Sequence, residues 1–321
     1  MFSLHKKILL DLFKLKNEKD LISVEKYFDN YLRGIFNLKK KELKKQKKCL
    51  CGSKIIINKV KIGFFDYITC ICGNVYISPM FNDKQLSQIY SQKGPYKVYR
   101  NKFLENKSKE KLRKTLNRRK ALQTLSVLKF KSKSILDLGC GNGDFLKNCK
   151  SIGFKKLYGV DTKYQDKVFS EHKINYSNSV KNFSKISTFD CITLWGVLEH
   201  LQDPIKYTKN IIKNIKKGGF LIFEVPFSDS LLMSFILKKK KPASRFLEPG
   251  RHLHFFSKKF FTIFAKKINF KIIDFETNGL DIQTITGKKN KNLTKDLLLT
   301  QNTLDELKIS DHARVVFKKI N

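Results

Sequence analysis

A glycine-rich turn follows a short apolar run, in the segment D-L-G-C-G-N-G-D-F at residues 137–145. Gly139, Gly141 and Gly143 carry no side chain, so a ligand can approach the backbone beside the amides that begin the next helix. The dinucleotide fingerprint G-x-G-x-x-G would need its third glycine at position 144, where the chain has Asp144. This loop therefore disfavours a nicotinamide dinucleotide.

A carboxylate stands at the end of the next apolar run. Asp161 closes Y-G-V-D, 22 residues after Gly139 (161 − 139). In this position a carboxylate can accept two hydrogen bonds from a ribose diol. The glycine loop and Asp161 together predict a nucleoside ligand without a pyrophosphate cradle.

Four cysteines are crowded into two C-x-C-G motifs, one at each end of a β-like stretch. Four thiolates suit a closed tetrahedral Zn²⁺ site, although the usual knuckle has C-x₂-C spacing. The total of seven cysteines favours reduced thiols or a metal over a disulfide framework. We expect a structural zinc here, with unligated cysteines at turn ends as the alternative. The predicted ligands are Cys49, Cys51, Cys70 and Cys72, while Cys140, Cys149 and Cys191 are expected to be core thiols.

Two histidines lie in R-H-L-H-F-F-S, residues 251–257, directly before a predicted amphipathic helix. On an extended backbone His252 and His254 would point the same way. An imidazole titrates near neutrality and can take a proton from a hydroxyl or carbon acid. We predict that His252, and secondarily His254, acts as a general base or acceptor ligand. A satisfied structural imidazole is the alternative.

The elements that position these residues alternate regularly from residue 134 onward. Short apolar runs such as S-I-L-D-L and F-D-C-I-T-L-W are separated by amphipathic segments, which is typical of βαβ units. The pattern predicts an α/β fold with a Rossmann-like parallel sheet of about seven strands. Helices are expected at 144–152, 204–216 and 258–267, and late strands at 270–276 and 313–318.

Changes in residue composition and periodicity divide the chain into four predicted regions. Residues 1–48 read as a helical extension of two helices, 49–82 as a cysteine-pinned β module and 83–131 as a helical connector. Residues 132–321 form the α/β domain, with insertions near 227–250 and 278–310. Long loops at the carboxyl edge of such a sheet commonly shape a binding site.

The α/β part resembles the class I S-adenosylmethionine-dependent methyltransferase family over about residues 134–276. Four strings carry the resemblance in order: D-L-G-C-G-N-G-D-F, G-V-D, F-D-C-I-T-L-W-G-V-L-E-H-L-Q-D-P and K-K-G-G-F-L-I-F-E-V-P. The resemblance implies S-adenosyl-L-methionine as cofactor, with its methionine moiety at the 139–143 loop, Cys140 included, and its ribose at Asp161. It also implies Asn178 at the adenine edge, Trp195 beside the cofactor and Asp137 in a position to orient the loop.

The N-terminal part resembles the zinc ribbon that precedes some bacterial methyltransferase domains, including those of sugar C-methyltransferases. The string C-I-C-G-N-V-Y-I-S-P-M-F-N-D-K-Q-L-S-Q-I-Y at 70–90 carries this resemblance. Residues 251–257 resemble the E-H-L-x-Y-F-S segment of the same enzymes, whose histidine belongs to the acceptor site. His252 takes that place, whereas Arg251 replaces the glutamate. The resemblance implies a small-molecule acceptor such as a sugar. Arg245, Arg251 and the four lysines at 238–241 could hold a phosphorylated or nucleotide-linked form of it, with a solvated loop as the alternative.

The net charge of +38 comes from 66 basic and 28 acidic residues and at face value points to a polyanionic partner. Only 8 of the 66 are arginine, the preferred reader of phosphates and bases, so the nucleic-acid signal is weaker than the charge suggests. We therefore expect a methyltransferase acting on a small molecule. An RNA-modifying methyltransferase that uses the basic surface is the alternative, and the intact loop argues against an inactive binding module.

The sequence also bears on location. No apolar stretch approaches the ~18 residues that a membrane span needs, and charges interrupt any secretory h-region, so a cytoplasmic protein is expected. The methylated atom, whether O, N or C, and the oligomeric state are left open by the sequence.

Overall fold

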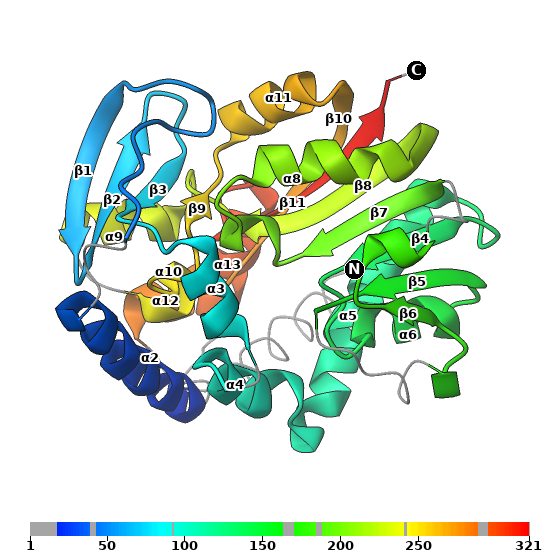
Figure 1. Ribbon diagram of the computed structural model, residues 1–321, viewed down its shortest axis with the longest axis horizontal. Helices are drawn as coiled ribbons and strands as arrows, with labels where there is room; N and C mark the ends of the chain where they lie inside the picture. The colour runs from blue at the N-terminus through cyan, green and yellow to red at the C-terminus, as the bar shows by residue number, and fades with distance from the viewer. Residues whose placement is uncertain are drawn as a thin grey trace.

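The computed structural model describes residues 18–38, 43–91, 93–162, 170–183, 188–240, 243–287 and 295–320. Two sheets, one of seven strands and one of four, form its framework (Figure 1). Of the two helices expected before residue 48, only the second lies within the described residues, as α2 (Glu18–Leu38). The first falls outside them.

The larger sheet has the strand order β10-β11-β8-β7-β4-β5-β6. Its central strands are parallel, and β11 runs antiparallel between β10 and β8. The predicted fold class, a Rossmann-like seven-stranded α/β sheet, is confirmed. The strands are β4 (Ser134–Leu138), β5 (Lys156–Val160), β6 (Asn175–Ser177), β7 (Phe189–Trp195), β8 (Ile215–Pro226), β10 (Phe270–Asn278) and β11 (His312–Lys319).

Helices cover both faces of this sheet (Figure 1). On one face α8 (Pro204–Ile211) and α11 (Lys258–Lys267) bury their apolar stripes, and on the other lie α5 (Glu110–Leu128) and α6 (Asp144–Ser151). A parallel strand covered on both faces is apolar on both, which explains why Ile135, Leu136 and Leu138 are all fully buried. The continuous apolar runs of the sequence therefore correspond to the centre of the sheet.

The helix expected at 204–216 is shorter than predicted. After α8 a 3₁₀ turn continues to Asn214, and β8 already begins at Ile215. Ile215 is 1% exposed and pairs with Phe189 at the start of β7. The burial of this side chain against the sheet outweighs the helical spacing of the segment, so the prediction was wrong over its last residues.

The smaller sheet joins distant parts of the chain. Its first three strands come from the cysteine module, and the fourth, β9, comes from the predicted histidine segment. The segment after β8 packs on the same core, where Leu232, Met233 and Phe246 lie with Tyr67 and Phe81. The elements are β1 (Ile56–Ile62), β2 (Phe65–Cys70), β3 (Val75–Ser78), β9 (His254–Phe255), α9 (Leu231–Lys239) and α10 (Ser244–Leu247).

Further helices lie near the carboxyl edge of the large sheet. The connector forms α3 (Asp83–Tyr90), α4 (Tyr96–Tyr99), a π-helical turn (Arg100–Leu104) and a 3₁₀ turn (Lys107–Lys109) before α5. Asn82 begins α3 with a capping box, because its side chain and that of Gln85 each accept a hydrogen bond from the other's backbone N–H. The last insertion contains α12 (Asp281–Thr286) and α13 (Lys295–Glu306). Within the described residues, none of the helices combines the length and apolar character needed to cross a membrane.

Candidate active site

The glycine loop folds across the end of β5. The backbone N–H groups of Gly139 and Cys140 both donate to the Val160 carbonyl oxygen, at 2.8 and 3.1 Å. Gly139 has φ of 72°, and a Cβ placed on it would lie 2.7 Å from Val197 Cγ2. Any other residue there would meet both backbone strain and a close contact. The loop is thus held tightly where the first two strands end.

Gly141 and Asp161 face the same opening. The Gly141 N–H donates to Asp161 Oδ2 at 2.9 Å, and a Cβ on Gly141 would meet no atom within 4 Å. A ligand can therefore approach the backbone beside the carboxylate, as the sequence predicts for a ribose. Burial is the main cause of the raised pKa of the Tyr96 hydroxyl. The nearby charge of Asp161 adds a smaller rise.

Asp137 lies below the loop and is 2% exposed. The Thr193 hydroxyl donates to its Oδ1 at 2.7 Å. Burial raises the pKa of Asp137 to about 7, and the Thr193 hydrogen bond opposes that rise. The carboxyl group thus links β4 to β7, and whether Asp137 contacts the cofactor or only orients the loop stays a prediction.

Asn178 and Trp195 mark two further edges of the predicted cofactor site. Asn178 is exposed and lines an open hollow at the end of β6, together with Tyr176 and Phe183. Trp195 ends β7, with its ring centroid 5.1 Å from that of Phe145, and its buried Nε1 has no hydrogen-bond partner among the described residues. Cofactor contact by these two residues remains a prediction.

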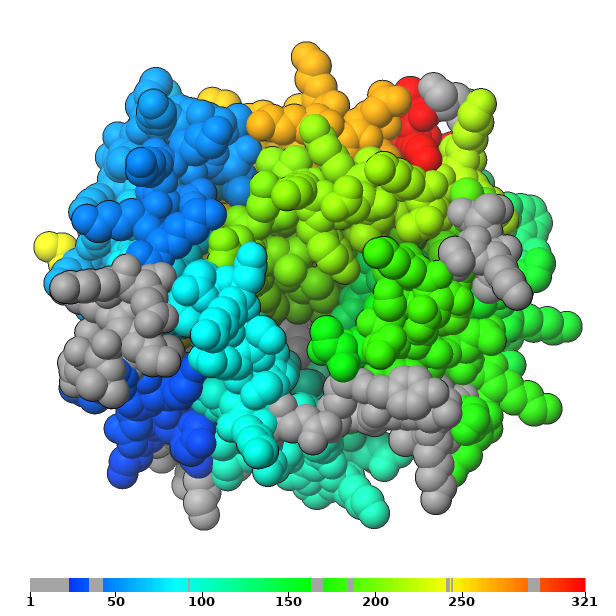
Figure 2. Space-filling model, viewed as in Figure 1, coloured from blue at the N-terminus to red at the C-terminus, as the bar shows by residue number. Residues whose placement is uncertain are grey.

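A hollow opens in the middle of the face seen in Figure 2, between the cyan residues near α3 and the green residues near β6. The 3₁₀ turn after β7 carries Glu199 and His200. The Glu199 carbonyl oxygen accepts a 2.8 Å hydrogen bond from the Leu253 N–H, which ties this turn to the segment with the two predicted histidines. Glu199 is 3% exposed, and burial raises the pKa of its carboxyl group to about 8.

His252 belongs to a buried polar cluster. Its Nδ1 lies 2.7 Å from the Phe246 carbonyl oxygen, and its Nε2 lies 3.4 Å from Glu248 Oε2 and 4.0 Å from Glu199 Oε1. The centroid of its ring is 5.0 Å from that of His200. Burial holds the pKa of His252 well below its usual value, so the imidazole is neutral at pH 7 with a lone pair available.

His254 lies in different surroundings. It pairs with Tyr76 of β3, and its Nε2 lies 3.2 Å from the Gln202 carbonyl oxygen. Only His254 and Phe255 form β9, whereas His252 precedes the strand, so the regular alternation expected over this segment does not apply. The structure thus brings His252, but not His254, together with Glu199 and His200.

The sequence pattern missed an aromatic and charged group beside this cluster. Arg251 Nη2 lies 3.1 Å from Glu248 Oε2, and its guanidinium stacks over the rings of Phe28 and Tyr99. The Tyr90 hydroxyl lies 2.9 Å from His200 Nδ1. The tyrosines at positions 90, 96 and 99 are the feature of the sequence that could indicate a packed aromatic group here. The surrounding lysines favour a polar connector instead.

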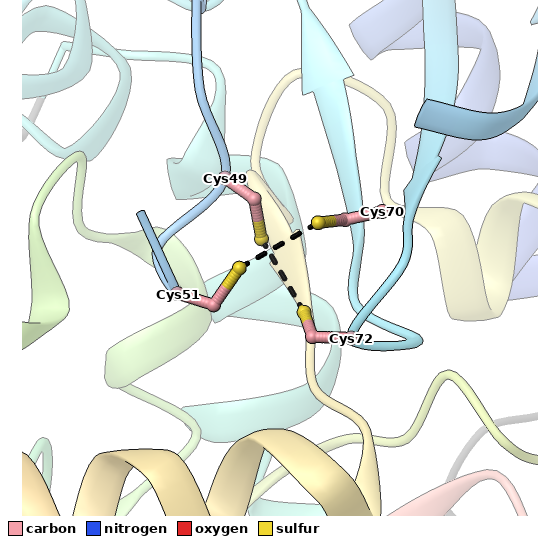
Figure 3. A group of neighbouring side chains, drawn as sticks. All are labelled: Cys49, Cys51, Cys70 and Cys72. Atoms are coloured by element: carbon pink, nitrogen blue, oxygen red, sulfur yellow. Dashed lines mark hydrogen bonds between the residues drawn. The ribbon is translucent and has the colours of Figure 1, made fainter. Parts of the chain in front are cut away.

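The four cysteines of the β module converge on one point (Figure 3). Cys49 Sγ lies 3.6 Å from Cys72 Sγ, and Cys51 Sγ lies 3.6 Å from Cys70 Sγ; all four sulfur atoms lie within 4.8 Å of one another. These distances exceed a disulfide bond of about 2.05 Å. They approach the separation of about 3.8 Å that follows from tetrahedral Zn–S bonds of 2.3 Å.

Tight turns make the C-x-C spacing workable. The Gly52 N–H donates to the Cys49 carbonyl oxygen at 2.9 Å, and Gly73 makes the equivalent bond to Cys70 at 2.8 Å. Gly73 has φ of 87°, and a Cβ on it would lie 2.9 Å from Ser257 Cβ. The donor set and its geometry fit a tetrathiolate zinc, and the second turn lies directly against the start of α11.

A model of the methyltransferase domain family matches residues 107–274, just over half of the chain. Among curated relatives, the tRNA U34 carboxymethyltransferase of Alteromonas mediterranea is 23% identical over 52% of this chain and 54% of its own length. The protein of that name from Sulfurovum sp. is 34% identical over 29% of this chain and 34% of its own length. The mitochondrial ubiquinone biosynthesis O-methyltransferase of Candida albicans is 26% identical over 30% of this chain and 33% of its own length. The chain spans about half or less of the length of these relatives.

Two solved structures are similar to the chain at low sequence identity. A SAM-dependent methyltransferase from Archaeoglobus fulgidus is 18% identical, with a TM-score of 0.48, over 70% of this chain and 99% of that one. A possible histamine N-methyltransferase from Thermotoga maritima is 16% identical, with a TM-score of 0.45, over 68% of this chain and 97% of that one. The family match covers α6, the glycine loop, Asp161 and the turn with Glu199. The chain therefore belongs to the methyltransferase domain family.

Proposed function

We propose that this methyltransferase modifies an RNA, with transfer RNA as the first class to test. Relatives named tRNA U34 carboxymethyltransferase match up to about half of the chain, and they support an RNA acceptor better than the small sugar expected from the sequence. Because the chain spans only part of their length, their activity is not transferred to it as a whole.

A basic arm that contacts the glycine loop carries this proposal. Residues 93–120 contain twelve Lys and Arg and only two Glu, and they form α4, the turns after it and the start of α5. Lysine contacts to phosphates give affinity without sequence preference. Tyr96 and Tyr99 of the same segment stack on each other at 5.3 Å and lie under Arg251, so they hold the arm in place rather than offering rings to bases. The exposed cations of the arm are Lys93, Lys97, Lys107, Lys111, Lys114 and Arg118.

The chemistry asked of the site is modest. Methyl transfer from a sulfonium is an in-line displacement that depends on positioning and, for a weakly acidic nucleophile, on a general base. The loop at 139–143 and Asp161 would position the cofactor. His252, neutral and buried beside the cleft, remains the predicted group for the acceptor's proton, and His254 the secondary one.

A sugar acceptor is the second candidate, and one observation favours it. The Glu199, His200 and His252 side chains form an enclosed polar corner suited to hydroxyl groups, and His252 takes the acceptor-site place in the resemblance to sugar C-methyltransferases. Arg251 cannot play the part of the glutamate it replaces, because a guanidinium is always charged and accepts neither a proton nor a hydrogen bond. A phosphorylated or nucleotide-linked sugar would be the form to test.

RNA binding by the basic arm tests the proposal. A triple variant Lys107→Ala, Lys111→Ala, Lys114→Ala should weaken tRNA binding and lower the slope of log K against log salt by about 2–3, since each phosphate contact contributes nearly one unit. The matched control replaces three exposed lysines remote from the arm, Lys54, Lys61 and Lys271, by Ala. Equal slopes for the two triple variants, or no tRNA binding by the unaltered chain, would contradict the RNA proposal.

We also propose that the cysteine cluster holds one structural zinc, as its donor set and sulfur separations suggest. The four thiolates close the coordination shell, so the metal would stabilise the module and take no part in methyl transfer. A cytoplasmic location, expected from the sequence, suits both reduced thiols and an RNA acceptor.

A further inference from the structure

A second group of metal-ligating side chains, separate from the cysteines, lies between the turn after β7 and the segment before β9. Glu199, His200 and His252 each offer one ligand atom, and the three atoms lie within 4.8 Å of one another. Glu248 Oε2 lies 3.4 Å from His252 Nε2 and brings a second carboxylate to the group. Two imidazoles and two carboxylates thus converge at one buried point.

Both imidazoles have the orientation that metal ligands usually have. His200 Nδ1 lies 2.9 Å from the Arg251 carbonyl oxygen, and His252 Nδ1 lies 2.7 Å from the Phe246 carbonyl oxygen. A proton on each Nδ1 satisfies these carbonyls and leaves both Nε2 lone pairs for the centre of the group. The Tyr90 hydroxyl, 2.9 Å from His200 Nδ1, can share that proton. Metal-binding histidines commonly donate their other N–H in this way.

The carboxylates differ in how their charge is balanced. Arg251 is paired with Glu248 at 3.1 Å. Glu199 is 3% exposed, and its Oε2 has no hydrogen-bond partner among the described residues. A buried carboxylate oxygen without a partner is costly. A cation between Glu199 and the two imidazoles would remove that cost.

We propose that Glu199, His200 and His252, with Glu248 at the edge, bind one first-row divalent cation such as Mn²⁺ or Fe²⁺. Imidazole and carboxylate donors suit these ions, and bonds of about 2.0–2.2 Å require the ligand atoms to close by only a few tenths of an ångström. With the cation bound, His252 is a ligand and not the proton acceptor, and an acceptor hydroxyl beside the cation would instead lose its proton to water more readily. This part of the cation in methyl transfer rests on the proposed function, whereas cation binding itself does not.

The proposal is tested by titrating the full chain, loaded with one equivalent of zinc that the thiolates take first, with Mn²⁺ and following free Mn²⁺ by electron paramagnetic resonance. Thiolates disfavour Mn²⁺, so the cysteine cluster does not compete. We expect one Mn²⁺ per chain, and Glu199→Gln and His252→Gln should each weaken binding at least tenfold, because even outer-shell changes cost about that much. The matched control is His254→Gln, which alters a buried imidazole of the same segment and should leave binding within about twofold of wild type.

Two results would overturn the proposal: no stoichiometric Mn²⁺ binding by the unaltered chain, or binding that the ligand variants weaken no more than His254→Gln does. If either ligand variant fails to fold, His200→Gln tests the same site from a half-buried position. S-adenosylmethionine affinity measured on the same samples reports whether the sheet is intact. A chain that binds Mn²⁺ as expected but methylates no RNA would contradict the proposed function and leave the metal site standing.

Discussion

The Ser257 hydroxyl donates a 2.6 Å hydrogen bond to the Cys72 carbonyl oxygen and accepts one from the Phe260 N–H at 3.0 Å. Ser257 is the N-cap of α11, so one side chain joins the cysteine module to a helix on the large sheet. Asn74 Oδ1 adds a second link by accepting from the Ser257 N–H at 2.8 Å. The module therefore fixes the end of the segment that carries His252.

Replacing Ser257 by Ala should lower the free energy of unfolding by about 1–2 kcal/mol, because the change removes both a helix cap and a buried hydrogen bond. Ser126→Ala is the control, since that exposed hydroxyl contacts only the Gln123 carbonyl oxygen of its own helix. Denaturant unfolding measures both. A Ser257→Ala effect no larger than that of the control would show that this link contributes nothing to stability.

Cys70→Ser should lose the zinc and loosen the β module while the large sheet stays folded, because structural zinc sites contribute directly to folding. Cys149→Ala removes a buried thiol of the other core and should retain the metal. Metal analysis of anaerobically prepared protein and hydrogen exchange provide the readouts. Much less than one zinc per unaltered chain would contradict the assignment.

Asp161→Ala should weaken S-adenosylmethionine binding at least tenfold, since hydrogen bonds to a charged group contribute about 1.5–3 kcal/mol each. The exposed Asp83→Asn serves as the control and should bind like wild type. Titration calorimetry measures the affinities. Unchanged affinity in Asp161→Ala would mean that the ribose lies elsewhere.

The raised pKa of Asp137 predicts a pH-dependent stability. A folded pKa of about 7 above an ordinary 3.8 means that this group's contribution is complete below pH 3.8 and is lost as pH rises through 7. The loss is at most about 1.4 kcal/mol per pH unit in that window. Asp137→Asn should lack this slope, so the stability of the wild type should fall relative to that of the variant as pH rises from 4 to 7. Parallel curves from pH 4 to 7 would show that the buried carboxyl group does not titrate as described.

His252→Ala should retain S-adenosylmethionine affinity and lose turnover by ~100-fold to 10,000-fold, the usual range for a positioned proton acceptor. His252→Asn keeps a polar contact without the base and separates acceptor binding from proton transfer. Single-turnover rates with the identified acceptor are the measurement. Turnover within about threefold of wild type in both variants, far short of that range, would make His252 structural.

Local patterns predicted the sheet well and the acceptor side less well. The runs at β4 and β7, the glycine loop and α11 follow from continuous burial and helical spacing that involve neighbouring residues only. The cluster around His252 depends on contacts between residues more than a hundred positions apart, such as Tyr90 with His200. No local period encodes such a contact, so Tyr90, Glu248 and Arg251 could not be placed from spacing.

The pairing of the cysteine module with the histidine segment could not be predicted from the sequence either. Two antiparallel pairs, Val75 with Phe255 and Tyr76 with His254, create the fourth strand of the small sheet. A two-residue strand leaves almost no pattern in the sequence, yet it determines that His254 faces Gln202 while His252 faces Glu199. The division between the two imidazoles is therefore a property of the tertiary structure.

The central claim is most directly tested by transfer of a labelled methyl group. The purified chain is incubated with a low concentration of methyl-labelled S-adenosylmethionine and, separately, with a transfer RNA pool and a pool of nucleotide-linked sugars. Asp161→Ala, with its weakened cofactor binding, is the control. We expect label in the RNA fraction that nuclease releases, and much less of it with the control. Label confined to the sugar fraction would contradict the RNA acceptor and establish the second candidate, and label in neither fraction would contradict both.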